Sequence, residues 1–599
     1  MNFSIVENFV LFLFIYQNFE LKRSIKLGLF NSISKYIIYK EKPKKNDFVL
    51  EENKSINCEA TKNVDSLDVF NRAEVEGAFI GCPVKDDILK NKISNDFELN
   101  KKVIKTSYDI PKNSDLVLRE FNLTVKEKNI KAFIVFIDGM TSSTNISNFI
   151  LEPLMLLSNI KIYDETKAIG DFIFERLIPY NQIKKAENYT DVVSAVNFGG
   201  CAIFIEDLEY AFVADIKTWE HRGVDAPKSE TVIRGPQEAF NEQIRSNTAL
   251  IRKILKDKDL IIQSVSVGDR SNTPCAVMYI KDIANDSLVH EVLKRVKSIK
   301  VDYIFDSGEL EQLLEDSTFL AAPQIFATER PDKVAMMLSQ GNVAVILDGS
   351  PHVLVMPATI TEFLHTTEDS NVRYPYVNFI RIIRIFGIAI ALLLPGMYIA
   401  ITNFHQEMIP TNLLFAIEAS RENVPFPSLV EILIMEFCFE LIREAGLRVP
   451  GAIGSTIGIV GGLILGQAAV SANVASPIMI IIVAITALGS FTVPSFSMSF
   501  SIRIIRFAYI ILGAVAGFLG ISLGLVINAL IFASSKSFGV PFLTPFAPIT
   551  NGKYADKLTR KPTWKQESRP DYLNVKNIKS QPRISRGWTA KDSDSEDDK

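Results

Sequence analysis

Acidic side chains inside an apolar segment are the residues of this sequence best placed to do chemistry. The segment PSLVEILIMEFCFELIREAGLRVP carries Glu431, Glu436, Glu440 and Glu444, and Arg443 is the only cation expected near them. The spacing of four places the last three glutamates on one face of a helix. Ionisable groups at membrane depth are costly and normally face water or a partner. Two interpretations therefore stay open: the face lines a polar path for cations, or the helix lies at the membrane interface with its acids hydrated.

No other pattern indicates catalysis or a cofactor. The sequence contains no G-x-x-x-x-G-K-[ST], G-x-G-x-x-G or G-x-S-x-G motif. The Asp-Gly pairs in KAFIVFIDGM and in AVILDGS are typical of turns. Five cysteines without a C-x-x-C pair and five dispersed histidines argue against a disulfide framework and a metal site. With a formal net charge of only −4, nothing points to nucleic-acid binding. We expect no enzyme, no cofactor and no metal.

The distribution of charge predicts an integral membrane protein. Charged residues are frequent up to about residue 384, whereas none occurs from Val449 to Ile502 and none between Arg506 and Lys536. Uncharged runs of this length exceed the roughly 20 residues that a membrane-spanning helix needs. A shorter uncharged run follows Arg384, and Arg381 and Arg384 lie just before that first span, which favours a cytoplasmic N-terminal domain. The candidate spans cover residues 385–404, 429–446, 454–473, 478–495 and 507–533.

Glycines spaced four apart predict close helix packing, because small residues let helix backbones approach one another in lipid. The first such stripe lies in the third candidate span, and shorter ones lie in the last span. The predicted packing residues are Gly454, Gly458, Gly462, Gly466, Gly513 and Gly517, and Gly520 with Gly524 repeats the spacing.

The number of crossings stays open. Five spans would place the C-terminal tail opposite the N-terminal domain, although the basic segment GKYADKLTRKPTWKQ favours the cytoplasmic side. An even number results if the acidic helix, or the segment IPTNLLFAIEASR, does not fully cross.

The region before the spans shows a mixed α/β pattern. KAFIVFIDGM predicts a buried strand, and CAIFIEDLEYAFVADI, LIIQSVSVGDRSNTPCAVMYI and GNVAVILDGSPHVLVMP predict hairpins. DSLVHEVLKRVKSI has the periodicity of an amphipathic helix. We therefore expect a cytosolic α/β domain of two subdomains, followed by an all-α polytopic membrane domain of four to six helices. The expected parts are a poorly ordered extension at 1–70, subdomains at 71–230 and 231–372, a membrane domain at 373–548 and a charged, mostly disordered tail at 549–599.

The segment IRGPQEAFNEQIRSN, where the two subdomains meet in the sequence, predicts a charged helix that starts after a Gly-Pro pair. Such a helix is a candidate contact between subunits or subdomains, and a hydrated helix face is the alternative. The residues concerned are Arg234, Gly235, Pro236, Glu238, Glu242, Arg245 and Asn247.

Several long segments resemble one known family. They are VIRGPQEAFNEQIRSNTALIRKIL, PQIFATERPDKVAMMLSQGNVAVILDGSPHVLVMP, LLLPGMYIAITNFHQEMIPTNLL, VPFPSLVEILIMEFCFELIREAGLRVP and SFGVPFLTPFAP. They resemble the A subunit of the GerA-type nutrient germinant receptors of endospore-forming bacteria, over about residues 133–548. The N-terminal extension and the tail depart from the family.

The resemblance implies a subunit of a three-part receptor in the spore inner membrane. Its partners would be a transporter-like B subunit and a lipoprotein C subunit, besides membrane lipid and further copies of itself. The family's A subunit carries two α/β subdomains and a helical membrane domain, and it is expected to oligomerise as a nutrient-gated ion channel. A subunit of a nutrient transporter and a non-conducting membrane scaffold are the alternatives, although no convincing internal repeat supports a transporter.

Overall fold

The computed structural model describes residues 48–51, 89, 91–125, 128–156, 169–217, 227, 230–318, 320–448, 461–462, 466–549 and 559–582. The chain divides into two units, 1–48 and 49–599, and every element below belongs to the second. Nearly all of the expected N-terminal extension lies outside the described residues, as do Gly454 and Gly458 of the glycine stripe.

The first sheet has five antiparallel strands in the order β1-β2-β4-β5-β3. Runs of valine, isoleucine and phenylalanine favour strands because these side chains pack well on a pleated surface. The predicted strand is β2, and the predicted hairpin is β4–β5, in which Ile203 faces Phe212. The strands are β1 Leu116–Val125, β2 Lys128–Ile137, β3 Ile183–Ala186, β4 Cys201–Ile205 and β5 Ala211–Ala214.

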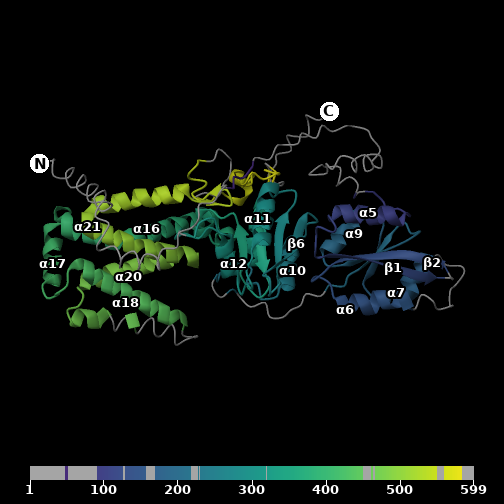
Figure 1. The fold of residues 1–599 in the computed structure, drawn as a ribbon, viewed down its shortest axis with the longest axis horizontal. Coiled ribbons are helices and arrows are strands. Elements are labelled where there is room, and N and C mark those ends of the chain that lie inside the picture. Colours follow the sequence, from purple (N-terminus) through teal and green to yellow (C-terminus); the bar gives the residue numbers. More distant parts are fainter. Residues whose placement is uncertain are drawn as a thin grey trace, which may run out of the picture. The chain divides into compact units, whose positions relative to one another are not determined.

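Helices cover both faces of this sheet (Figure 1). Alternate side chains of β2 enter two separate cores: Phe133 packs toward α5 and α9, whereas Ile134 packs toward α6 and α7. The Phe133 ring stacks on Phe204 of β4 at 4.7 Å. One face carries α5 Phe97–Ser107 and α9 Tyr189–Asn197, and the other carries α6 Ser143–Ile146, η1 Ser147–Leu151, α7 Glu152–Leu156, α8 Ile169–Phe172 and η3 Ile173–Leu177.

The second sheet repeats the topology of the first, with the order β6-β7-β9-β10-β8. Both remaining predicted hairpins are confirmed as antiparallel pairs, β6–β7 and β9–β10. The shared strand order was not visible as a sequence repeat, because a fold preserves its pattern of apolar positions rather than particular residues. The strands are β6 Leu260–Val267, β7 Thr273–Ile280, β8 Phe326–Thr328, β9 Val343–Leu347 and β10 Val353–Met356.

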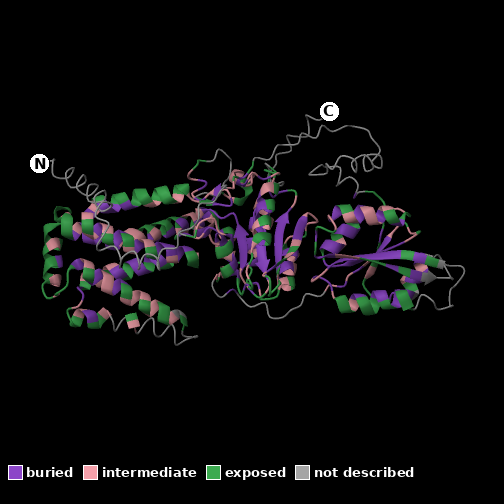
Figure 2. Ribbon diagram, viewed as in Figure 1, coloured by how far each residue is buried: buried purple, intermediate pink, exposed green. Residues whose placement is uncertain are grey.

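Four helices sandwich the second sheet, and its strands are largely buried (Figure 2). The predicted amphipathic helix is α11, which buries Leu288, Val292 and Val296. α10 Ile244–Ile254 packs with α13 Pro331–Gln340 on one face, while α11 Asp286–Ser298 and α12 Ser307–Leu314 occupy the other. Two short helices, α14 Ile360–Leu364 and α15 Glu368–Asn371, then lead into the helical part.

The α/β region is thus followed by a helical part, as expected. Two of its helices, α16 and α21, are long and apolar enough to cross a membrane. The apolar helix α20 has 15 residues and ends before the expected boundary at 495. The described elements are α16 Tyr374–Phe404, η4 Gln406–Met408, α17 Thr411–Arg421, α18 Ser428–Arg448, α20 Pro477–Phe491 and α21 Phe496–Ser534.

The last helix folds back on itself, which the prediction of one span over 507–533 did not foresee. The backbone leaves the helical conformation at Ala516 and at Gly517, whose φ of 58° suits glycine. A Cβ on Gly520 would lie 2.2 Å from the carbonyl oxygen of Leu512. Residues eight apart cannot meet in a straight helix that rises 1.5 Å per residue. α21 is therefore an antiparallel hairpin with arms at 496–515 and 518–534.

The chain after α21 returns to the second α/β subdomain. The Ile360 N–H donates to the Phe542 carbonyl at 2.9 Å, and the Phe538 N–H donates to the Asp316 carboxylate at 2.7 Å. The segment contains β11 Lys536–Ser537, β12 Val540–Pro541, η5 Thr563–Lys565 and η6 Asp571–Leu573. Residues 559–582 of the expected tail are described and include these two short helices. The tail lies on the same side of the helical part as the α/β region.

Candidate functional site: an arginine–carboxylate cluster between α18 and α21

Glu436 and Arg506 form a buried ion pair between two helices. Glu436 of α18 is fully buried, Arg506 of α21 is 1% exposed, and Arg506 Nη2 lies 2.8 Å from Glu436 Oε2. Arg506 Nη2 also donates to Glu440 Oε1 at 3.2 Å. A single guanidinium thus joins two of the three glutamates that the spacing of four had placed on one helical face.

Glu440 is the centre of this cluster. Its other oxygen, Oε2, accepts from Arg443 one turn away at 2.5 Å, and Arg503 Nη1 lies 3.8 Å from it. The Phe500 ring lies between the two arginines, with its centroid 4.8 Å from the Arg443 guanidinium and 4.7 Å from that of Arg503. The expectation that Arg443 would be the only nearby cation is wrong, because α21 brings two further arginines to the same face.

The outer two glutamates lie in different surroundings. Glu431 is fully buried, and its Oε1 accepts from the backbone N–H and the hydroxyl of Ser476, at 2.6 and 2.7 Å. Ser476 is the N-cap of α20, so Glu431 places a negative charge where the helix dipole favours one. Glu444 pairs with Arg448 at 2.7 Å on the surface. The four acids therefore form a buried capping contact, a central cluster and a surface pair.

The cluster keeps unused polar capacity among the described residues. Glu436 Oε1 and one buried nitrogen each of Arg443, Arg503 and Arg506 have no hydrogen-bond partner there, whereas Glu436 Oε2 has its ion pair with Arg506. Buried polar groups are normally satisfied, and a half-satisfied charged network is costly. The arrangement is therefore suited to hold water or a small ion, or to exchange its ion pairs when the helices move.

Glycine contacts fix α16 against its neighbours, but mostly at positions other than those predicted. A Cβ on Gly513 would lie 2.5 Å from the Gly396 carbonyl oxygen, and one on Gly489 would lie 2.6 Å from that of Gly387. Gly513 is thus a predicted glycine at a tight contact with α16, and Gly520 and Gly524 lie at close contacts between the two arms of α21. A Cβ on Gly462 would meet nothing within 4 Å in this chain, one on Gly466 would make only an ordinary contact with Ile480, and Gly517 forms the turn of the α21 hairpin.

The prediction that a helix starts directly after Gly235-Pro236 is wrong. Residues 231–243 are not helical, and α10 begins at Ile244. The Pro236 carbonyl instead accepts from Arg330 at 2.8 Å, so this part of the chain is held extended against the second subdomain. Asn247 stabilises the approach to α10, since its side chain accepts from the Asn241 N–H at 2.9 Å and donates to the Asn241 carbonyl. The backbone N–H and carbonyl groups that would form hydrogen bonds within a helix are therefore bonded to other groups instead.

The other members of the set lie around α10. Glu238 pairs with Lys253 at 2.6 Å, and the Glu242 carbonyl accepts from the Gly349 N–H at 2.7 Å. Arg234 is exposed, and a Cβ on Gly235 would touch Asn371. Within this set, Arg245 pairs with Asp138, which follows β2 in the first subdomain.

The stronger link between the subdomains is Arg252, which sequence reasoning missed. Arg252 is 2% exposed, and its Nη2 donates to Asp115 at 2.8 Å and to the Leu260 carbonyl at 3.1 Å. Asp115 precedes β1 of the first subdomain, whereas α10 belongs to the second. Arg252 lies on the buried side of an amphipathic helix. Since a buried arginine is rarely unpaired, its position in the sequence could have predicted a specific partner.

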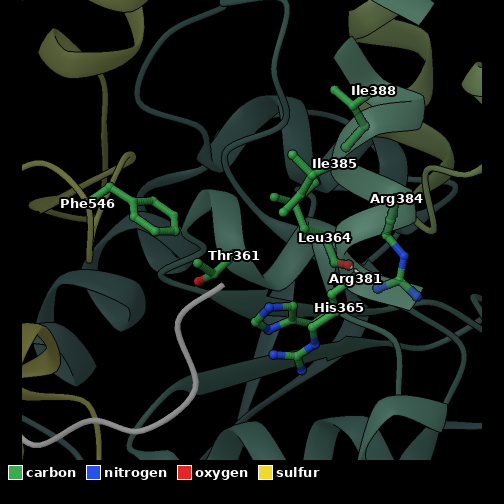
Figure 3. Close-up of a pocket in the computed structure, with 8 residues that line it drawn as sticks. All are labelled: Thr361, Leu364, His365, Arg381, Arg384, Ile385, Ile388 and Phe546. Atoms are coloured by element: carbon green, nitrogen blue, oxygen red, sulfur yellow. Dashed lines mark hydrogen bonds between the residues drawn. The ribbon is translucent and has the colours of Figure 1, made fainter. Parts of the chain in front are cut away.

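A second polar cluster joins α16 to the second subdomain. Asp369 of α15 accepts from Arg381 at 3.1 Å and from Arg384 at 3.2 Å, and Arg560 from the tail binds its carbonyl at 2.5 Å. Burial raises the pKa of Asp369, but the two guanidinium groups outweigh burial and hold the pKa below its ordinary value. Figure 3 shows the small pocket beside this cluster, where Phe546 of the tail lies across from the start of α16.

Most of the chain matches one protein family. The family described as Bacillus/Clostridium GerA spore germination protein matches residues 102–572. The chain therefore belongs to the GerA family of spore germination proteins, and the resemblance to its A subunits is confirmed.

Individual relatives match along most of their length. The chain is 38% identical over 501 residues to spore germination protein KA of Bacillus subtilis (strain 168), covering 82% of this chain and 91% of that protein. It is 35% identical over 457 residues to the uncharacterized membrane protein YfkQ of the same organism, covering 76% and 88%. The crystal structure of the N-terminal domain of the A subunit of the Bacillus megaterium spore germinant receptor GerK3 is 30% identical, with a TM-score of 0.35, over 45% of this chain and 98% of that one.

Proposed function

We propose that this chain is the A subunit of a nutrient germinant receptor and forms part of a cation path that opens when the spore meets its nutrient. In this proposal the helical part crosses the spore inner membrane and assembles with further copies of itself. The α/β subdomains lie in the cytosol, and a transporter-like B subunit and a lipoprotein C subunit complete the receptor. Membership of the GerA family and the two long apolar helices support this assignment.

The observation that carries the proposal is the buried pair of Glu436 and Arg506 with Glu440 beside it. A lone charge at membrane depth costs about 2.5–3.5 kcal/mol on insertion scales, and such groups mark ion pathways. A structural role alone would be served as well by apolar residues of similar volume, since buried ion pairs rarely add net stability. The retention of two glutamates and three arginines on facing helices therefore supports a polar path.

The pairing also suggests how such a path is kept closed. Within the closed subunit the arginines of α21 neutralise the acids of α18, so the face does not attract cations. A shift of α18 away from α21 separates Glu436 from Arg506 and exposes the acids to water. Acidic side chains around a water-filled passage favour cations. Nutrient binding elsewhere in the receptor would supply the free energy for this separation.

The test uses spores in which Glu436→Gln or Glu440→Gln replaces the native subunit. Each change keeps the shape and leaves Arg506 one carboxylate partner, Glu440 in the first variant and Glu436 in the second, so receptor levels by immunoblot should stay near the parental level. Release of potassium after nutrient addition should fall. Glu444→Gln is the matched control, because that acid lies on the same helix but is 49% exposed and pairs with Arg448.

Recordings of the complete receptor in a planar bilayer separate the three function classes. Discrete nutrient-dependent cation currents that shrink in both variants support the path. Saturable nutrient uptake without currents would indicate a transporter subunit. The proposal would be contradicted if Glu436→Gln, Glu440→Gln and the double variant were all present at normal abundance and released potassium at the parental rate. A non-conducting membrane scaffold would then be the remaining function.

A further inference from the structure

The first turns of α16 present an apolar face that begins earlier than the predicted span at 385. Tyr376, Phe379, Ile383 and Phe386 are 57%, 61%, 47% and 65% exposed. Their spacing of three and four residues places them along one side of the helix. These aromatic and aliphatic side chains therefore extend the apolar surface of the helix toward its N-terminus.

The charged residues in these turns do not interrupt that face. Arg381 and Arg384 are 3% and 8% exposed and point to the opposite side, where both bind Asp369. α16 has 31 residues and is thus roughly 46 Å long, which matches the roughly 40–45 Å of a bilayer with its headgroup layers. A bilayer crossed by the whole length of α16 would have its headgroup level near Tyr376, before Arg384.

The C-terminal tail is bound to α16 at this same level. The Arg560 N–H donates to the Asn378 side chain at 2.7 Å, and the Asn378 side chain donates back to the Arg560 carbonyl at 3.1 Å. Arg560 is buried, whereas Lys561, Trp564 and Lys565, which follow it directly, are exposed. Lys565 Nζ lies 4.8 Å from the centre of the Trp564 ring.

We propose that Lys561, Trp564 and Lys565, together with Tyr374 and Tyr376 of α16, form a surface that binds the anionic headgroups of the bilayer that α16 enters. Tryptophan and tyrosine favour the membrane–water interface because each combines an apolar ring with a polar tip. Lysines beside such rings attract the phosphate-bearing anionic lipids of a leaflet. Tyr376 belongs both to this surface and to the apolar face of α16. The proposal rests on α16 crossing the membrane, as the proposed function requires.

The experiment uses the full chain in lipid nanodiscs with Trp564 as the sole tryptophan, after Trp219→Phe and Trp588→Phe. Lipids brominated near the headgroup or near the acyl terminus quench tryptophan emission at the corresponding depth. We expect headgroup-level bromine to quench Trp564 more strongly than deep bromine, and more in phosphatidylglycerol-containing discs than in purely zwitterionic ones.

Lysine variants test the electrostatic part. Each lysine near an anionic surface contributes about fivefold to binding, so Lys561→Gln with Lys565→Gln should weaken the attachment of the tail by about 30-fold. High salt should act in the same direction. The matched control is Lys297→Gln with Lys300→Gln, two exposed lysines near the end of α11, which should leave the quenching of Trp564 unchanged.

A second reporter distinguishes failure of this proposal from failure of the proposed function. A chain whose only tryptophan comes from Phe386→Trp reports insertion of α16. If that chain is quenched by brominated lipid and Trp564 is not, the headgroup-binding surface is refuted while the crossing stands. If neither is quenched, α16 does not enter the bilayer. Equal quenching of Trp564 in anionic and zwitterionic discs also overturns the proposal.

Discussion

Removal of Arg506 should be far more costly than removal of any surface arginine of the helical part. In Arg506→Met the side chain keeps most of its length and apolar contact, but Glu436 loses the guanidinium at 2.8 Å and stays fully buried. Breaking a buried pair from one side costs about 3–5 kcal/mol because it leaves an uncompensated charge. Typical total stabilities are about 5–15 kcal/mol, so the variant should be scarce in spore membranes.

The companion variants make this prediction refutable. Glu436→Leu combined with Arg506→Met removes both charges, and such replacements are commonly neutral or stabilising. The double variant should therefore regain parental abundance and unfolding temperature in detergent, while its nutrient-triggered potassium release stays low. Arg448→Met, at an exposed pair, should change neither quantity. If the two single changes are mild and simply additive in the double variant, the pair is not the coupled buried unit described above.

Three further predictions concern other parts of the chain. Gly513→Ala places a methyl group against a helix backbone and should cost about 1–3 kcal/mol, seen as a lower unfolding temperature, whereas Gly462→Ala meets open space and should not. Arg252→Met leaves Asp115 unpaired, so limited proteolysis of the full chain should cut faster between the two sheets; unchanged cutting would contradict the link. Burial raises the pKa of Glu362 to about 7 from 4.5, so the folded state holds that proton more tightly and stability should fall by up to about 3 kcal/mol as pH rises through this window. Glu362→Gln should abolish that slope in denaturant titrations.

Seven of the ten strands in the two sheets were predictable because their information is local, whereas β1, β3 and β8 were not predicted. A strand that is buried on both faces needs a continuous apolar run, and IVFI of β2 and VAVIL of β9 provide one. The turns after β6 and β9 carry glycine, which marks those hairpins, whereas the turn after β4 has Asp207 at positive φ. What local pattern could not show is that both sheets share one strand order, since that depends on which distant strands pair.

Only the α18 side of the central cluster was predicted, because only that side depends on local spacing. The spacing of four in α18 places Glu436 and Glu440 on one face without reference to the rest of the chain. Arg503 and Arg506 reach that face only because α21 packs against α18, a contact between residues more than sixty positions apart. The sequence feature that could have indicated these partners is the pair of arginines in SIRIIR, which lies between two uncharged runs. A cation in such a place requires a buried partner.

Helix propensity alone could not locate the start of α10, because tertiary hydrogen bonds compete with helical ones just before it. Glu238 to Arg245 has helical spacing of charge, yet the chain stays extended up to Gln243. The Arg330 guanidinium donates to the Pro236 carbonyl, and the Gly349 N–H donates to the Glu242 carbonyl. Tertiary hydrogen bonds therefore replace those that a helix would make. Tertiary context overrides local preference wherever it offers the backbone better partners.

The return of the tail to the α/β region also sets an order of events during synthesis. Ile360 binds the backbone of Phe542, and Asn378 binds Arg560, although nearly the whole helical part lies between these partners in the chain. A chain leaves the ribosome from its N-terminus. The start of α16 is therefore made well before the residues that fasten it exist. A chain that stopped at Ser534 would possess every helix described from α16 to α21, with that junction still open.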